Sequence, residues 1–202
     1  MNEPKPEQMI SIEGTKGCSV FYRMYTWCIS PDYGTELQSR IDEMLSHVQG
    51  LNDDRLLVLL GALIIENALD EMLAAIMPGY KPLQKKRDFT FSLRIEVAKA
   101  LRLIPAKILN CVDLIRSIRN DFVHNLSIDV FDRLEPSTLQ SMRDKASNLN
   151  VQTYEEHAGL FREFVVLTAV SLCVYTEQIS RLNDFIRSSA FPPNLKAFLE
   201  RS

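Results

Sequence analysis

The residues best suited to chemistry lie just past the middle of the chain, in the segment 119–124, which reads Arg-Asn-Asp-Phe-Val-His. In metal-independent RNA cleavage, an arginine holds the scissile phosphate, and a histidine moves protons to or from the ribose hydroxyl. Arg119 and His124 are the matching residue types, and Asn120 could orient the substrate. The segment therefore provides a candidate catalytic set of Arg119, Asn120 and His124.

The spacing of these residues sets a condition on that chemistry. Five residues at about 100° each place Arg119 and His124 about 140° apart on a regular helix, so the two side chains do not converge unaided. Asn120 and His124 are four residues apart and share a face. Convergence would need the long Arg119 side chain, an unwound last turn, or the same helix of a second subunit across a two-fold axis.

A structural role for the same residues is the competing interpretation. A charge inside an apolar stretch needs a partner, and Glu66 on an earlier helix is the candidate partner of Arg119. His124, with Asn125, would then simply cap the end of its helix. The sequence leaves both interpretations open.

Two further groups of charged residues are candidate anion sites. Arg94, at the start of a predicted helix, is either an anion ligand or an intramolecular partner of Glu66 or Asp70. A basic loop could contact phosphates, or it could be an ordinary solvated loop. Its cationic residues are Lys81, Lys85, Lys86 and Arg87.

Motifs for other kinds of chemistry are missing from the sequence. The three histidines stand singly and no cluster has zinc-ligand spacing, so we expect no metal. No glycine-rich phosphate loop or nucleophile elbow occurs, so we expect no cofactor. The four cysteines show no C-x-x-C spacing and are expected to be reduced. A net charge of −3 argues against direct DNA binding, because that affinity comes mainly from many lysines and arginines.

Hydrophobic periodicity predicts an all-α fold, an irregular multi-helix bundle of about six helices. The helix predicted over 54–77 is apolar almost all round its first half, which places it at the centre of the bundle. The amphipathic helix predicted over 106–124 carries the candidate catalytic set at its end. Residues 78–91 are predicted as a loop. The other helices are expected to begin at about Thr35, Ser92, Pro136 and Tyr154, with a last short stretch over 194–201.

The first 33 residues lack this helical period and are predicted to be a partly ordered N-terminal extension, with the helical domain over 34–202. Aromatic residues in the extension could pack on the domain or belong to an interface with another protein. They are Phe21, Tyr22, Tyr25 and Trp27. The apolar segments 56–65 and 164–175 fall short of the roughly 20 residues that a membrane span needs, so both are predicted core helices and no membrane partner is expected.

Three blocks, in order, resemble the signature of the mannitol operon repressor family. They are Phe91-Ser-Leu-Arg-Ile95, Leu101-Arg-Leu-Ile104 and the stretch 113–124, and they follow an acidic and apolar helix that contains the stretch 66–73. The resemblance covers roughly residues 50–180 and implies a role in transcriptional regulation. No helix-turn-helix unit with a basic recognition helix is recognisable, so a regulator that acts by binding protein fits the residues better.

The segment 119–124 is also similar to the R-x4-6-H motif of helical domains of the HEPN type. That resemblance implies the alternative function, a metal-independent ribonuclease or toxin-like domain that uses Arg119, Asn120 and His124. Our first hypothesis is a non-enzymatic regulatory protein with a protein partner or a homodimer, and RNA is a ligand only under the alternative. The polar, proline-bearing start of the chain is unlike a secretory signal, which predicts a cytoplasmic protein.

Overall fold

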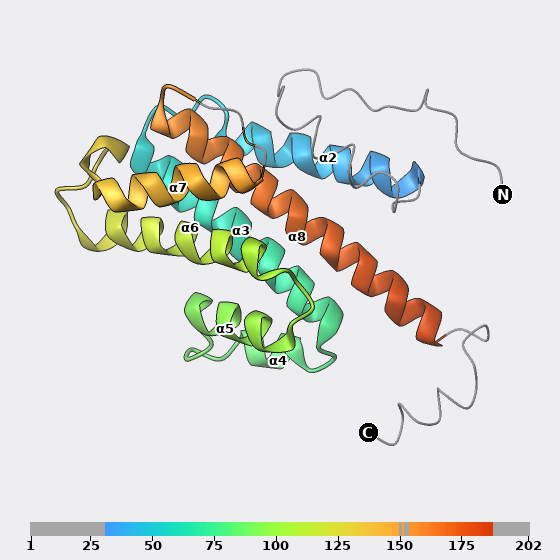
Figure 1. Cartoon of the computed structure of the whole chain (residues 1–202). Helices are drawn as coiled ribbons and strands as arrows, with labels where there is room; N and C mark the ends of the chain where they lie inside the picture. Colours follow the sequence, from blue (N-terminus) through green and yellow to red (C-terminus); the bar gives the residue numbers. More distant parts are fainter. Residues whose placement is uncertain (1–30, 150, 152–153, 188–202) are drawn as a thin grey trace.

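The structure is a computed structural model, and it describes residues 31–149, 151 and 154–187. This part of the chain contains seven α-helices, one 3-10 helix and no strand, which confirms the predicted all-α bundle (Figure 1). The four aromatic residues of the predicted extension and the stretch 194–201 lie outside the described residues. The elements are α2 (Pro31–Val48), α3 (Asp54–Ile76), α4 (Tyr80–Gln84), α5 (Phe91–Leu101), α6 (Ala106–His124), η2 (Phe131–Arg133), α7 (Pro136–Asn148) and α8 (His157–Arg187).

Local capping explains where several helices begin. The side chain of Asp53 accepts a hydrogen bond from the Leu56 amide at 2.8 Å, and the Thr90 hydroxyl accepts one from the Leu93 amide at 3.3 Å. Pro136 opens α7, where its missing N–H costs nothing. Two helices begin at other residues than predicted. Helix α2 begins four residues before Thr35, and α8 begins three residues after Tyr154.

The centre of the bundle is formed by α3 and α8, as predicted for α3. Figure 1 shows α8 running along α3, and α2, α4, α5 and α6 also contact α3. A Cβ added at Gly61 would lie 3.0 Å from side-chain atoms of Phe161 and Val165, so the glycine lets the two helices approach closely.

One helix in the described part, within His157–Asp184, is long and apolar enough to cross a membrane, with a mean hydropathy of 1.6. However, 78% of that window is buried inside the bundle. A core helix passes the same test of length and composition, so the helix is weak evidence for a span.

A short helix, α4, stands where the sequence predicted only a loop. The Tyr80 side chain explains it, because it is fully buried and its hydroxyl donates a hydrogen bond to Asp70 on α3. Pro82 lies in the first turn of α4, where no intrahelical N–H bond is lost. Tertiary contact with α3 therefore stabilises a helix of five residues that has no periodicity of its own to reveal it.

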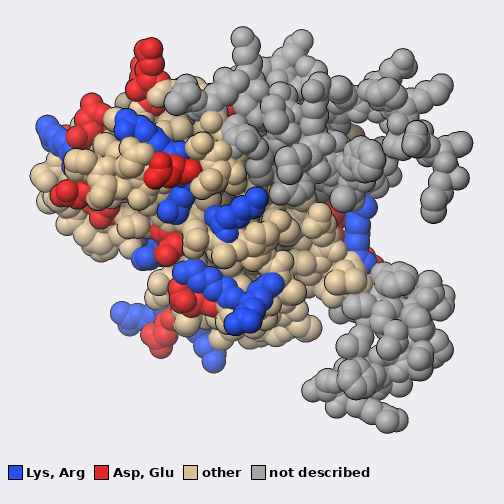
Figure 2. All heavy atoms as spheres, in the orientation of Figure 1, with Lys and Arg blue, Asp and Glu red and all other residues tan. Residues whose placement is uncertain are grey.

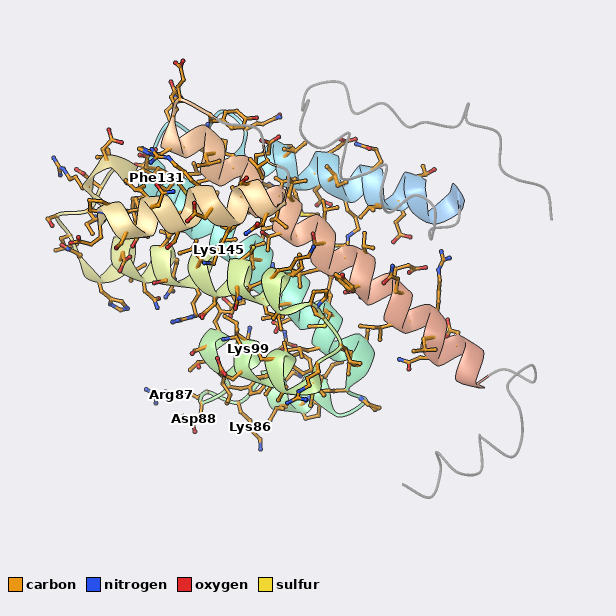
Figure 3. All side chains as sticks on the ribbon, viewed as in Figure 1. Lys86, Arg87, Asp88, Lys99, Phe131 and Lys145 are labelled. Atoms are coloured by element: carbon orange, nitrogen blue, oxygen red, sulfur yellow. The ribbon has the colours of Figure 1, made fainter. Side chains whose placement is uncertain are left out.

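The chain after α6 folds back onto the start of α3. The Phe131 amide donates to the Asp54 carboxylate at 3.0 Å, and the Arg55 guanidinium donates to the Ile128 carbonyl at 2.7 Å. The Phe131 ring, labelled in Figure 3, packs between Phe122 and Phe161 with centroid separations of 5.4 and 5.2 Å. These contacts fix the C-terminal end of α6, where the candidate catalytic set lies.

Candidate functional site

The C-terminal end of α6 is a regular helix through its last residue, His124. The Asn125 amide still donates to the Asp121 carbonyl at 3.1 Å, so the last turn is not unwound. Asn125 then makes a turn in which its side-chain oxygen accepts from the amide of Ser127 at 3.1 Å. An unwound last turn was one of three ways in which Arg119 and His124 could converge. The structure shows that the last turn of α6 is regular, so this way is not used.

The structural interpretation predicted that Arg119 pairs with Glu66, but Glu66 pairs with Arg94 instead. Arg119 is half-buried, and its Nη1 donates to the Asn120 side-chain oxygen at 3.1 Å. Because Asn120 and His124 share a helix face, this bond draws the guanidinium toward the face that carries His124. The long arginine side chain thus partly offsets the angle that separates Arg119 from His124 along the helix.

His124 is exposed at the end of α6, so it is open to solvent and to a ligand. Nearby, burial raises the pKa of Asp121, and the negative charge of Glu135 raises it further. At the end of α6, Arg119, Asn120 and His124 place a guanidinium, an amide and an imidazole at the partly exposed surface. The structure brings Arg119 and Asn120 into contact, but His124 makes no hydrogen bond to either among the described residues.

The sequence left open whether Arg94 binds an anion or pairs with Glu66 or Asp70. In the structure it pairs with both carboxylates. Its Nη1 lies 2.6 Å from Glu66 Oε1 and 3.0 Å from Asp70 Oδ2. Its guanidinium carbon lies 5.8 Å from the centroid of the Phe89 ring. The Arg94 side chain is only 12% exposed, and both of its carboxylate partners lie on α3. Arg94 and Glu66 therefore tie α5 to α3.

The same network extends to α4 through Asp70. One carboxylate oxygen of Asp70 accepts from the Tyr80 hydroxyl, and the other accepts from Gln84 Nε2 at 2.6 Å. Burial, followed by the bond to Asp70, raises the pKa of Tyr80 above its ordinary value. We call Glu66, Asp70, Tyr80, Gln84 and Arg94 the polar network. Its groups bond to one another across three helices, and the Nε of Arg94 is the one buried side-chain N or O atom of these five residues that has no hydrogen-bond partner in the described part of the chain.

The basic loop is solvated, and its cations point away from the bundle. Lys85, Lys86 and Arg87 are exposed, and in the described part of the chain their side chains make no ion pair. Figure 3 shows Lys86, Arg87 and Asp88 projecting from the connection between α4 and α5. These exposed cations are accessible to phosphates.

An apolar surface that the sequence did not single out lies on α3. Leu56, Leu59 and Leu63 are 44%, 38% and 50% exposed, although α3 is the central helix of the bundle. Spacings of three and four residues place these leucines on one side of α3. We call these three residues the leucine face. The sequence hint was the all-round apolar character of the first half of α3, which we attributed to burial alone.

Other exposed apolar residues lie on the segments beside the leucine face. Arg55 donates to the Leu126 carbonyl at 3.3 Å, which places the end of α6 beside the start of α3, and Leu126 is 82% exposed. Val123, on the last turn of α6, and Leu93, on the first turn of α5, are exposed as well. Leu126 therefore adds to the exposed apolar surface near the start of α3.

A cluster of three polar side chains, Asp132, Arg143 and His157, joins η2, α7 and α8, and the sequence did not predict it. His157 Nδ1 lies 2.8 Å from Asp132 Oδ1, and His157 Nε2 lies 2.6 Å from Arg143 Nη2. A guanidinium can only donate, so Nε2 accepts and Nδ1 carries the proton that is donated to Asp132. Both ring nitrogens of His157 therefore make hydrogen bonds, and this cluster connects three elements of the fold.

Comparisons of this chain with protein-family models, with curated proteins and with solved structures find no match.

Proposed function

We propose that this chain is a non-enzymatic regulatory protein of the cytoplasm that acts through protein–protein contacts in transcriptional regulation. The observation that carries the proposal is the leucine face on α3. The resemblance of residues 50–180 to mannitol operon repressors suggests that the process is transcriptional regulation. The exposed leucines could bind a partner protein, so the chain would need no DNA-binding helix of its own.

The leucine face fits an amphipathic helix of a partner protein. Leu56, Leu59 and Leu63 repeat with the spacing that a partner helix uses to interdigitate its own apolar residues. Covering the exposed part of each leucine would contribute about 1 kcal/mol, so the three together are a useful core for an interface. Glu66, three residues after Leu63, lies on the same side of α3 and supplies a charged group at the end of the stripe.

The test compares two double variants in cells that lack the chromosomal gene. Leu59→Asp with Leu63→Asp places charges on the leucine face, and Leu103→Asp with Leu182→Asp places the same charges on exposed leucines elsewhere. We expect the wild type and the control pair to restore the transcript profile, whereas the leucine-face pair does not. Circular dichroism and urea unfolding of the purified variants establish that each is folded.

Two results would overturn this proposal. One is full restoration of the transcript profile by the leucine-face pair. The other is a transcript profile that is the same with and without the gene under every growth condition tried.

A second candidate is metal-independent RNA cleavage by Arg119, Asn120 and His124. The observation that favours it is the exposure of His124, together with the bond that draws Arg119 toward the same face. The test is degradation of a mixed RNA substrate without added metal, by the wild type beside folded Arg119→Ala and His124→Ala variants. Cleavage by the wild type alone assigns roles to both residues, and no cleavage at high protein concentration eliminates this candidate.

A further inference from the structure

A polar groove of about 270 Å³ lies between α6 and α7, apart from the leucine face and from the candidate catalytic set. On the α6 side, Asn110, Asp113 and Ser117 follow one another at spacings of three and four residues, so they form a ladder on one helix face. On the α7 side, Ser141 and Lys145 are four residues apart and form a second ladder. Two rows of hydrogen-bonding groups therefore face one groove.

The one carboxylate of this groove is already engaged by cations. Asp113 Oδ1 lies 3.0 Å from Arg116 Nη2, and Asp113 Oδ2 lies 3.6 Å from Lys99 Nζ. Arg116 also lines the groove, whereas Lys99 reaches Asp113 from α5. Asp113 therefore adds little negative potential, and the remaining charge of the groove is positive.

Lys145 is the cation that lacks a counter-charge. It is half-buried, it lines the groove, and it makes no ion pair or hydrogen bond within the described ranges. Burial raises the pKa of the Cys111 thiol to about 11, and Lys145 and Lys107 are close enough to oppose that rise. Two amino groups therefore lie near the same part of the boundary between α6 and α7. Figure 3 labels Lys145 there, and Figure 2 shows Lys and Arg side chains interspersed with Asp and Glu over the face that α5, α6 and α7 form.

Lys145 is partly exposed and has no counter-charge within the described ranges, so its ammonium group is available to an anion. The hydroxyls of Ser117 and Ser141 can donate hydrogen bonds to such an anion, and the Asn110 amide can donate or accept. Leu114 is the one apolar side chain of the lining, and none of the lining residues is aromatic, so the groove offers no stacking surface for a flat ring. These features select a small, charged and hydrophilic ligand.

We propose that the groove between α6 and α7 binds a small phosphomonoester, with Lys145 at the phosphate and with Ser117, Ser141 and Asn110 as hydrogen-bonding partners. A phosphate has more acceptor oxygens for these several donors than a carboxylate, which has only two. The ligand bridges α6 and α7, so its binding stabilises the packing of these two helices. This inference does not depend on the proposed regulatory function, because it involves none of the leucine-face residues.

The test uses isothermal titration calorimetry on the full chain with sn-glycerol 3-phosphate, inorganic phosphate and glycerol as three separate probes. We expect sn-glycerol 3-phosphate to bind, inorganic phosphate to bind more weakly, and glycerol not to bind. Lys145→Gln should weaken binding of the phosphomonoester by at least about tenfold, because it removes a charge-assisted hydrogen bond. Ser117→Ala with Ser141→Ala should weaken it by a smaller factor.

Lys86→Gln is the matched control, because it removes the same charge from the exposed basic loop. We expect this control to bind like the wild type. An equal loss in Lys86→Gln and Lys145→Gln would show general attraction of anions and would overturn the proposal. Absence of binding by the folded wild type at ligand concentrations up to about 10 mM would overturn it as well.

Discussion

The polar network and the end of α6 each contain an arginine and a side-chain amide, but they differ in how many partners the arginine has. In the network, Arg94 contacts two carboxylates, and Asp70 also accepts from a tyrosine and a glutamine. At the end of α6, Arg119 bonds only to its neighbour Asn120 among the described residues, and His124 is exposed. The first region uses its charges to hold three helices together, and the second leaves its polar groups available to a ligand.

This difference shows that residue type alone does not separate a structural cation from a functional one. Arg94 and Arg119 both lie on helices that pack against α3. What separates them is whether carboxylates on α3 lie within reach, because a buried guanidinium must be matched by acceptors. The comparison can be tested by removing the members of each region in turn.

The largest effect is expected for Arg94→Ala, which leaves Glu66 and Asp70 without their cation. We expect a loss of about 3 kcal/mol in the free energy of unfolding, because breaking a buried ion pair leaves an uncompensated charge. Urea unfolding followed by circular dichroism measures it. A loss as small as that of an exposed surface substitution would show that the network does not hold α5 to α3.

A smaller effect is expected for Tyr80→Phe, which removes the hydroxyl that donates to Asp70. At neutral pH the loss should be about 1 kcal/mol, the usual contribution of one hydrogen bond. The pKa of Tyr80 is raised in the folded state, so its contribution is complete below the ordinary tyrosine pKa of 10.0 and is lost as the pH rises above it. The stability difference between wild type and variant should therefore shrink between pH 9 and pH 11 in urea unfolding, and a constant difference would contradict the raised pKa.

The smallest effect is expected for Arg119→Ala at the end of α6. Its side chain makes one hydrogen bond to a neighbouring residue, so the free energy of unfolding should fall by less than about 1 kcal/mol. The same urea titration as for Arg94→Ala gives a direct comparison. A loss equal to that of Arg94→Ala would mean that Arg119 is structural, and it would remove the basis for the ribonuclease candidate.

The bundle and its central helix could be predicted from the sequence, because they depend on periodicity and capping along one stretch of chain. Helix α6 has the bounds that its apolar stripe indicated, and α3 begins at Asp54, where the helix predicted over 54–77 begins. Helix α4 could not be predicted, since a buried tyrosine that bonds to a distant aspartate stabilises it.

The candidate site was predictable only as a set of residue types. The pattern of segment 119–124 indicated Arg119, Asn120 and His124 as candidates. The predicted partner of Arg119 was wrong, because Glu66 pairs with Arg94 and Arg119 bonds to Asn120. The exposed leucines of α3 and the groove between α6 and α7 were missed, since each depends on which neighbouring helix covers a surface.

The sequence by itself thus determined that this chain forms helices and which stripe of each helix is apolar, because both properties are set within a few turns of one segment. Only the tertiary structure decided which charges are paired and which apolar side chains stay uncovered. Arg94 and Glu66 are 28 residues apart, and Arg55 and Leu126 are 71 residues apart, so the packing of separate helices brings each pair together. Partnership across such distances depends on the shape of the whole bundle, which no local pattern in the chain records.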